Sequence, residues 1–465
     1  MNAISYPRNW LLIGGLCLLQ LLVIVLPVPI SGLHISSLIV LSAILTAVLL
    51  SSVSNTILFL LFISAVIPGE VSREHLTLPM GIKFSEGVFL VVVTLVMLTA
   101  LLERTRPVHT VLDRPLTVFL GLVAVSCAVG LYHGVSTSQM LRDVRYPCYY
   151  TLFFVAKQFI PTHRARRVLM VVVLIAAVVG LEYMVEFFSL VNLSVAGQFE
   201  RVARPAGLMF PIGSLIIGAM WLYGGNRQDR LFATLALIPI SLAFVLTVGR
   251  GMWIAAVVGL MALSFLYLRD RQREGMQGVL TILALPCTVL ILFGFFQGAT
   301  ETGVGATAFR RLARIQTAEQ DHSISGRLLS YQVAITKIIR RPIIGGGHGE
   351  VVEFYDTHAS TPGLNRLGAV DNLYLTLMLR MGLIGLIAFL WLYSIALLTA
   401  YRLFQTSRDP DTRLFAASFF TVYSAMLVYG MADPTLMVTR LILIHATMLG
   451  VLASLAAHEE RGESR

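Results

Sequence analysis

Long apolar blocks alternate with short polar connections along nearly the whole chain. The blocks run for about 17 to 25 residues, so each can cross a hydrocarbon core about 30 Å thick as a helix. The pattern predicts an all-α integral membrane protein, a polytopic bundle of about 12–14 transmembrane helices. The predicted spans cover residues 10–30, 35–51, 55–67, 85–102, 115–133, 147–160, 166–190, 207–223, 230–247, 251–268, 277–297, 371–400, 412–430 and 437–457.

One long segment of mixed polarity, residues 298–370, interrupts this pattern. It divides the chain into an N-terminal set of transmembrane helices, residues 1–297, and a C-terminal set, residues 371–465. A loop of this length is too long for a simple connection, which indicates that it carries function.

A short amphipathic helix is predicted inside this loop. Ser323 or Ser325 can cap its start, its apolar residues occupy about half of its circumference, and Pro342 stops it after Arg340. The glycine run that follows, which ends at Gly347, allows an open backbone.

Composition agrees with a membrane protein. Of 465 residues, 57% are hydrophobic and 13% are charged, and the mean hydropathy is +0.80, whereas soluble domains carry about 25% charged residues. The net charge of +10 is scattered over short loops. We therefore attribute it to the bilayer surface and expect no nucleic-acid partner.

The distribution of Lys and Arg predicts the orientation, because cytoplasmic loops retain positive charge. It places both termini in the cytoplasm and the long loop on the opposite side of the membrane. The cytoplasmic loops then contain Arg104, Arg106, Arg114, Lys157, Arg164, Arg166, Arg167, Arg227, Arg230, Arg269, Arg271, Arg273, Arg402, Arg408 and Arg413.

Three arginines on the predicted outer side form a candidate phosphate site. Arg204 and Arg250 each begin a span, and Arg327 lies on the loop helix. A guanidinium is a permanently charged planar fork that suits phosphate oxygens, so together they could bind a diphosphate. Snorkelling or a local salt bridge remains open for each one.

A proton acceptor could come from Asp371, His348 or His358. Asp371 begins the span after the loop, next to Asn372 and Tyr374, and could instead serve as a helix N-cap. The two histidines compete with it because their acidity suits this role better.

Arg380 lies well inside the same predicted span and needs a partner there, for which Glu182 and Glu186 are candidates. The sequence GGGHGE resembles a phosphate loop but lacks its Gly-Lys-Ser/Thr ending. The acidic and histidine residues around it lack the spacing of a metal site. We therefore expect neither a metal nor a nucleotide cofactor.

Four motifs, in this order, resemble the O-antigen ligase and polymerase superfamily of bacterial glycosyltransferases. They are TVGRGMW around Arg250, SGRLLSY around Arg327, RRPIIGGGHG from Arg340, and DNLYLTLMLRMGLIG from Asp371. RVARPAGLMFPIGS around Arg204 is similar to an arginine-bearing span entry of that family. The family-like core covers residues 200–400. The family often has His-Asn where this chain has Asp371-Asn372.

The resemblance implies transfer of a glycan from an undecaprenyl diphosphate carrier to an acceptor hydroxyl at the periplasmic face. Arg204, Arg250 and Arg327 would bind the diphosphate, and a general base would activate the acceptor for inverting attack. The acceptor would be another lipid-linked unit or a lipid A core sugar, in O-antigen or exopolysaccharide assembly. Other polysaccharide-assembly proteins are further candidate partners.

Two other classes remain open. A transporter or flippase of lipid-linked glycans predicts charges along a central path and two similar halves, but no repeat is visible and the unusual charges gather at one face. A structural membrane protein would not need converging arginines.

Overall fold

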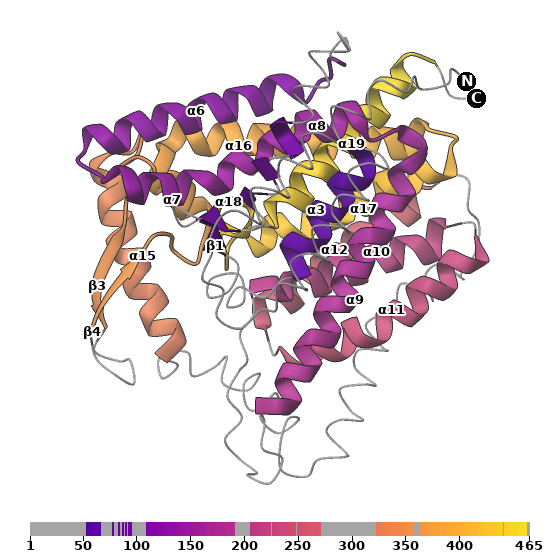
Figure 1. The fold of residues 1–465 in the computed structure, drawn as a ribbon, viewed down its shortest axis with the longest axis horizontal. Helices are drawn as coiled ribbons and strands as arrows, with labels where there is room; N and C mark the ends of the chain where they lie inside the picture. Colours follow the sequence, from indigo (N-terminus) through magenta and orange to yellow (C-terminus); the bar gives the residue numbers. More distant parts are fainter. Residues whose placement is uncertain are drawn as a thin grey trace, which may run out of the picture. The chain divides into compact units, whose positions relative to one another are not determined.

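The structure is a computed structural model (Figure 1). It describes residues 53–66, 77–78, 82–83, 86–87, 89–90, 92–94, 108–190, 205–224, 226–247, 249–270, 322–356, 363–439 and 441–462.

Helices dominate the described part of the chain. They are α3 (Val53–Val66), α6 (Asp113–Tyr132), α7 (Thr137–Cys148), α8 (Leu152–Phe159), α9 (Ala165–Leu190), α10 (Met209–Tyr223), α11 (Arg227–Leu246), α12 (Arg250–Arg269), α15 (His322–Arg340), α16 (Leu373–Thr406), α17 (Pro410–Tyr429), α18 (Thr435–Val438) and α19 (Ile442–Glu460). Two short hairpins accompany them: β1 (Thr77–Leu78) with β2 (Ile82–Lys83), and β3 (Val352–Asp356) with β4 (Gly363–Leu367).

Seven helices of the described residues, α6, α9, α11, α12, α16, α17 and α19, are long and apolar enough to cross a membrane. The predicted fold class, an all-α polytopic membrane protein, is confirmed. Two shorter apolar helices, α3 and α10, have 14 and 15 residues. The predicted spans 10–30, 35–51 and 277–297 lie outside the described residues.

The apolar block at 147–160 does not form one span. It divides into a 3₁₀ turn, Tyr149–Thr151, and the eight-residue helix α8, which extends only about 12 Å. Both segments nevertheless bury aromatic side chains, Tyr150 and Phe153 among them. The block is apolar because it packs inside protein, which the hydropathy pattern does not distinguish from a span.

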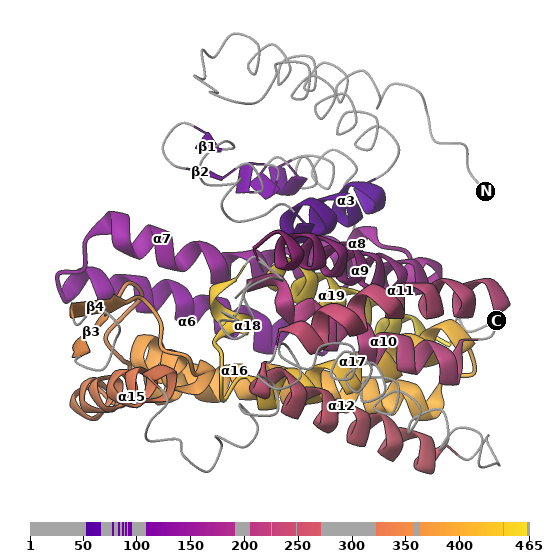
Figure 2. The same ribbon diagram turned by 90° about the horizontal axis from the view of Figure 1, so that it is seen from below.

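The chain falls into two compact units, of which the smaller contains residues 1–107 and the larger almost all of the rest. In the larger unit α17 packs against α9, α10, α12, α16 and α19 (Figure 2). Buried aromatic rings join its helices: Phe119 lies edge-on to Phe389, and Tyr393 lies next to Tyr423. The hydroxyls of Tyr150 and Tyr393 are 2.7 Å apart.

Ion pairs gather at one end of this bundle. Lys157 pairs with Asp113 at 2.6 Å, and Arg413 pairs with Asp270 at 2.7 Å. Arg166, at the start of α9, pairs with both Asp229 on α11 and Asp411 on α17. These loops are among those that the charge pattern assigns to the cytoplasm, so the structure brings together connections that were predicted to share one side.

At the other end, α16 is kinked at Gly382, whose φ is 63° and ψ −164°. The segment from Pro342 to Gly347 lies against the kink and pairs with the backbone groups on both sides of it. Pro342 and Ile343 accept from the amides of Leu383 and Ile384, while Gly346 and Gly347 donate to the carbonyls of Leu379 and Arg380. The glycine run therefore closes a helix kink.

The loop helix α15 begins at His322, so Ser323 and Ser325 lie inside the helix and neither caps it as predicted. Its end at Arg340 agrees with the prediction. The β3–β4 hairpin, with Val352 opposite Leu367, was not predicted. Ala334 and Ile338 of α15 pack with Val352, Val370 and Leu379 in one apolar cluster, so the loop is anchored to the start of α16.

Candidate active site

Asp371 lies on the rim of the bundle, directly before α16, and makes an ion pair with α15. Nε of Arg327 donates to Oδ2 of Asp371 at 2.8 Å. The hydroxyl of Tyr331, one turn further along α15, donates to the carbonyl oxygen of Asp371 at 2.6 Å. The side chains of Arg327 and Asp371 are 40% and 47% exposed, so both remain accessible to a ligand.

The N-cap of α16 is Asn372 and not Asp371. The side-chain oxygen of Asn372 accepts from the amide of Leu375 at 3.0 Å, and its Nδ2 donates to the carbonyl of Met431 at 3.1 Å. Tyr374 donates to the carbonyl of Leu427 at 2.6 Å. Asn372 and Tyr374 thus fix the rim to the end of α17, and the Asp371 carboxylate is free of the capping role.

A second carboxyl group, Asp433, belongs to this rim cluster. It lies in the turn after α17, where Thr435 donates to it. Burial raises the pKa of Asp433, and the charge of Asp371 adds to this effect, while Thr435 and Arg327 oppose it. Two interacting carboxyl groups beside an arginine can hold or exchange a proton.

Arg250 begins α12 beside the same turn. A Cβ atom built on Gly251 would lie 3.2 Å from both Ala432 and the ring of Tyr429, so the start of α12 packs directly on the residues that precede Asp433. The side chain of Arg250 lies outside the described residues, as do Arg204 and His358. The turn Pro205–Leu208 follows Arg204, and a Cβ atom built on its Gly207 would lie 3.9 Å from both Thr247 and Met252.

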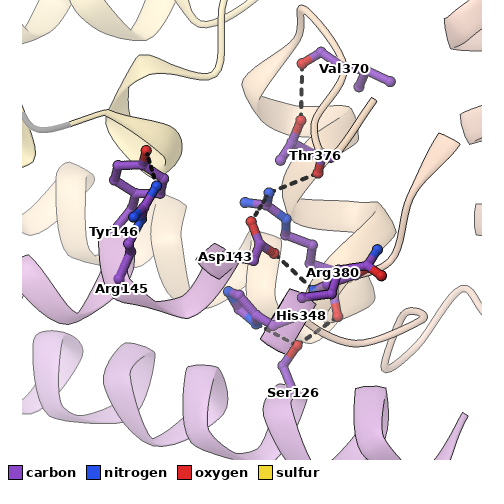
Figure 3. A network of polar contacts seen from close by, with 11 residues as sticks. Ser126, Asp143, Arg145, Tyr146, His348, Val370, Thr376 and Arg380 are labelled. Carbon is purple, nitrogen blue, oxygen red and sulfur yellow. Dashed lines mark hydrogen bonds and ion pairs between the residues drawn. The ribbon is translucent and has the colours of Figure 1, made fainter. Parts of the chain in front are cut away.

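Arg380 forms a separate, buried network with Asp143 of α7 (Figure 3). The Arg380 side chain has no exposed surface; its Nη2 donates to Oδ1 of Asp143 and to the carbonyl of Gly368 at 2.9 Å. Oδ2 of Asp143 accepts from the amide of Gly349 at 2.9 Å. The prediction that Glu182 or Glu186 pairs with Arg380 is therefore wrong.

His348 is buried behind this pair. Its Nδ1 lies 2.8 Å from Oγ of Ser126, and that hydroxyl donates to the carbonyl of Arg380 at 2.8 Å. Because the hydroxyl proton is used, Nδ1 must carry the imidazole hydrogen. Burial and then the charge of Arg380 lower the pKa of His348 to about 3. The imidazole is therefore neutral and a weak base, which argues against His348 as a proton acceptor.

Gly347 has a packing role. Its φ of 96° suits glycine, and a Cβ atom there would collide with the backbone of Gly130 in α6. The acidic residues nearby are engaged in ion pairs: Glu350 with Lys337, and Glu353 with Arg366 at 3.0 Å. Within the described residues, no group of three or more His, Cys, Asp or Glu side chains could hold a metal ion.

A comparison with protein families matches residues 235–390 to the family model of O-antigen ligase. This segment is similar to the O-antigen ligase family and is called the O-antigen ligase domain below. The match confirms the predicted resemblance to the O-antigen ligase and polymerase superfamily. The O-antigen ligase domain covers about a third of the chain, and no curated protein matches the sequence.

The O-antigen ligase domain supports a multi-pass membrane enzyme of this type, with glycosyltransferase-like activity on a lipid-linked glycan and a glycan acceptor. It includes Arg250, Arg327, Asp371 and Arg380. It excludes Asp143 and Asp433, the two acidic residues that the sequence analysis did not assign to the site. The only signal for Asp433 in the sequence is its place in the turn between the last two predicted spans. The only signal for Asp143 is its place in a polar segment between two apolar blocks.

Proposed function

We propose that this protein transfers a glycan from an undecaprenyl diphosphate carrier to a hydroxyl group of an acceptor glycan at the periplasmic face of the inner membrane. The observation that carries the proposal is the Arg327–Asp371 ion pair, which is half-exposed on the rim. The pair provides a cation that can bind phosphate oxygens and a carboxylate that can accept the proton of the acceptor hydroxyl. Both residues lie within the O-antigen ligase domain.

In this mechanism the oxygen of the acceptor hydroxyl attacks the anomeric carbon, and Asp371 accepts the proton of that hydroxyl. The new carbon–oxygen bond forms as the bond to the carrier's diphosphate breaks, with inversion at that carbon. The electron pair leaves with the diphosphate, whose growing charge Arg327 and Arg250 stabilise. Arg204 joins them as a third cation. Tyr331 and Asn372 hold Asp371 in place.

Asp433 supports the same step. Burial raises the pKa of Asp433, and its carboxyl group interacts with the charges of both Asp371 and Arg327. Asp371 is 47% exposed, so it can pass the proton to solvent, which restores the base for the next cycle. His348 and His358 remain predicted alternatives for the base, and the buried position of His348 argues against it.

The test is transfer by the purified protein, using a synthetic undecaprenyl diphosphate-linked glycan. We expect Asp371→Asn to lower the rate by about 100-fold or more, the usual contribution of a general base, because the amide keeps the volume but cannot accept the proton. Glu353→Gln, which changes an exposed carboxylate of β3, is the control and should keep wild-type activity.

Full activity of Asp371→Asn would remove Asp371 from the mechanism. If the wild type moves lipid-linked glycan across vesicles but forms no glycosidic bond, the protein is a transporter. Both reactions free the donor's carrier diphosphate, so the product separates them: a polymerase yields a longer glycan that is still linked to a carrier, and a ligase yields a glycan joined to an acceptor without one.

A further inference from the structure

A cavity of about 320 Å³ lies between α7, α16 and the chain around Gly349 and Gly368. Its lining combines polar and apolar residues: Gln139, Arg142, Asp143, Tyr146, Gly349, Val351, Gly368, Ala369, Arg380 and Val438. Counted along α16 from its N-cap, Arg380 is about 12 Å from the rim. The volume is at the lower end of the range for ligand pockets, about 300–1,000 Å³, which suits a single sugar ring.

Arg380 is incompletely satisfied in this cavity. A guanidinium has five N–H donors, and the bonds to Asp143 and Gly368 both come from Nη2. Within the part of the chain that the structure describes, Nε and Nη1 are buried and have no hydrogen-bond partner. A buried cation with open donors is costly unless a ligand completes its contacts.

The charge of the cavity wall is positive overall. Asp143 cannot offset more than one arginine, because its Oδ1 pairs with Arg380 and its Oδ2 accepts from Gly349. Arg142 is a second guanidinium in the wall, on the exposed side of α7. An anionic group therefore matches the two arginines better than a neutral one.

The remaining walls suit a sugar. Tyr146 presents an aromatic ring whose hydroxyl is held by Arg145 at 2.9 Å, and a flat apolar face with a polar edge is a common surface for carbohydrate rings. Gln139 is fixed by its bond to the carbonyl of Gly349 at 2.7 Å.

From these contacts we propose that the cavity binds an acidic sugar, a uronate ring of the glycan, with its carboxylate on Arg380 and Arg142. The proposal rests on the proposed function, since it makes the glycan the ligand, and it adds the class of sugar that the protein selects. A uronate carboxylate would accept from Arg142, and rotation of the buried Arg380 side chain would bring its unpartnered Nε or Nη1 to the same carboxylate. The ring would lie against Tyr146.

The test is binding of D-glucuronate to the full chain in nanodiscs, measured by saturation-transfer NMR, with D-glucose as the neutral analogue and inorganic phosphate as a competitor. We expect a signal for glucuronate, at least tenfold weaker affinity for glucose, and no displacement by equimolar phosphate. Arg142→Gln and Arg380→Lys should each weaken glucuronate binding about tenfold, the loss of one charge-assisted contact.

Arg408→Gln, an exposed change outside the cavity, is the matched control and should bind like the wild type. Arg142 is exposed, so its variant carries the test even if Arg380→Lys fails to fold. Equal binding of glucose and glucuronate, displacement by phosphate, or unchanged affinity in Arg142→Gln would each overturn the proposal.

The two proposals fail separately. Asp371→Asn should bind glucuronate with wild-type affinity although it does not transfer. A wild type that transfers glycan but ignores glucuronate would refute the acidic-sugar site alone, and a wild type that binds glucuronate without transferring glycan would refute the glycosyltransferase alone.

Discussion

Arg380 illustrates what one residue in the sequence can and cannot predict. A cation inside an apolar span must have a partner, because an isolated charge there costs several kcal/mol, and that expectation is confirmed. The identity of the partner was wrong, because Asp143 is 237 positions away in the chain. Pairing at this separation depends on how helices pack, which hydropathy does not encode.

For Asp371, too, the sequence predicts the position but not the role of the side chain. Its place at the start of a span is visible in the sequence, but an N-cap and a general base use the same residue type. The structure separates them, since Asn372 makes the capping bond and Asp371 faces Arg327. The catalytic role itself stays a prediction until activity is measured.

The buried His348 should make stability depend on pH. Its pKa is about 3 in the folded chain, compared with 6.5 for the free side chain, so the unfolded chain binds the extra proton between these values. Stability is therefore intact above pH 6.5 and is lost as the pH falls towards 3, by about 1.4 kcal/mol per pH unit for this one group.

His348→Asn, whose amide N–H can still reach Ser126, should show a shallower loss than the wild type between pH 6 and 4. Unfolding by denaturant in detergent micelles measures this difference, and Arg408→Gln should keep the wild-type slope. Identical slopes for His348→Asn and the wild type would mean that the imidazole is charged in the folded protein.

At the scale of elements, the apolar pattern predicts the long helices well. The blocks 115–133, 166–190, 230–247, 251–268, 371–400, 412–430 and 437–457 all correspond to helices long enough to cross a membrane. The pattern wrongly predicts a span at 147–160, where the apolar segment is buried by protein. It does not predict the β3–β4 hairpin, whose register is set by pairing between the two strands. Both outcomes depend on tertiary contacts.

The kink of α16 depends on Gly382. Its φ and ψ fall in a region that is open almost only to glycine, and a Cβ atom there would collide with the carbonyl of Ile343. We expect Gly382→Ala to destabilise the protein by about 3 kcal/mol or more, measured as a lower unfolding midpoint and faster proteolysis in micelles.

Gly121, within α6, offers a matched control, because a Cβ atom there meets no described atom within 4 Å. Gly121→Ala should raise stability by about 0.5–1 kcal/mol, as expected for alanine in a helix. A tolerated Gly382→Ala would show that α16 can straighten.

At the scale of the molecule, polar groups separate to the two ends of the bundle. One end has the ion pairs of Lys157, Arg166 and Arg413, and the other has the rim cluster and the cavity. The order of spans and the charge of their connections predict that these ends differ. They do not predict which side chains meet, because loops that share a side can pair in many ways.

Single-cysteine variants in a cysteine-free background test the orientation. Arg366→Cys on β4 should react with a membrane-impermeant maleimide in intact cells, because the hairpin lies at the rim end. Arg408→Cys, between α16 and α17, should react only after the inner membrane is permeabilised. The reverse result would put the rim cluster in the cytoplasm and exclude transfer at the periplasmic face.

The pairing of Pro342–Gly347 with the kink also constrains the order of folding. Two amides and two carbonyls of α16 pair with this upstream segment, so the contacts that surround the kink cannot form in an isolated α16. The kink can make these contacts only when the segment Pro342–Gly347 lies against α16. A defect in export of the loop is therefore expected to leave these four backbone groups of α16 without their partners in Pro342–Gly347.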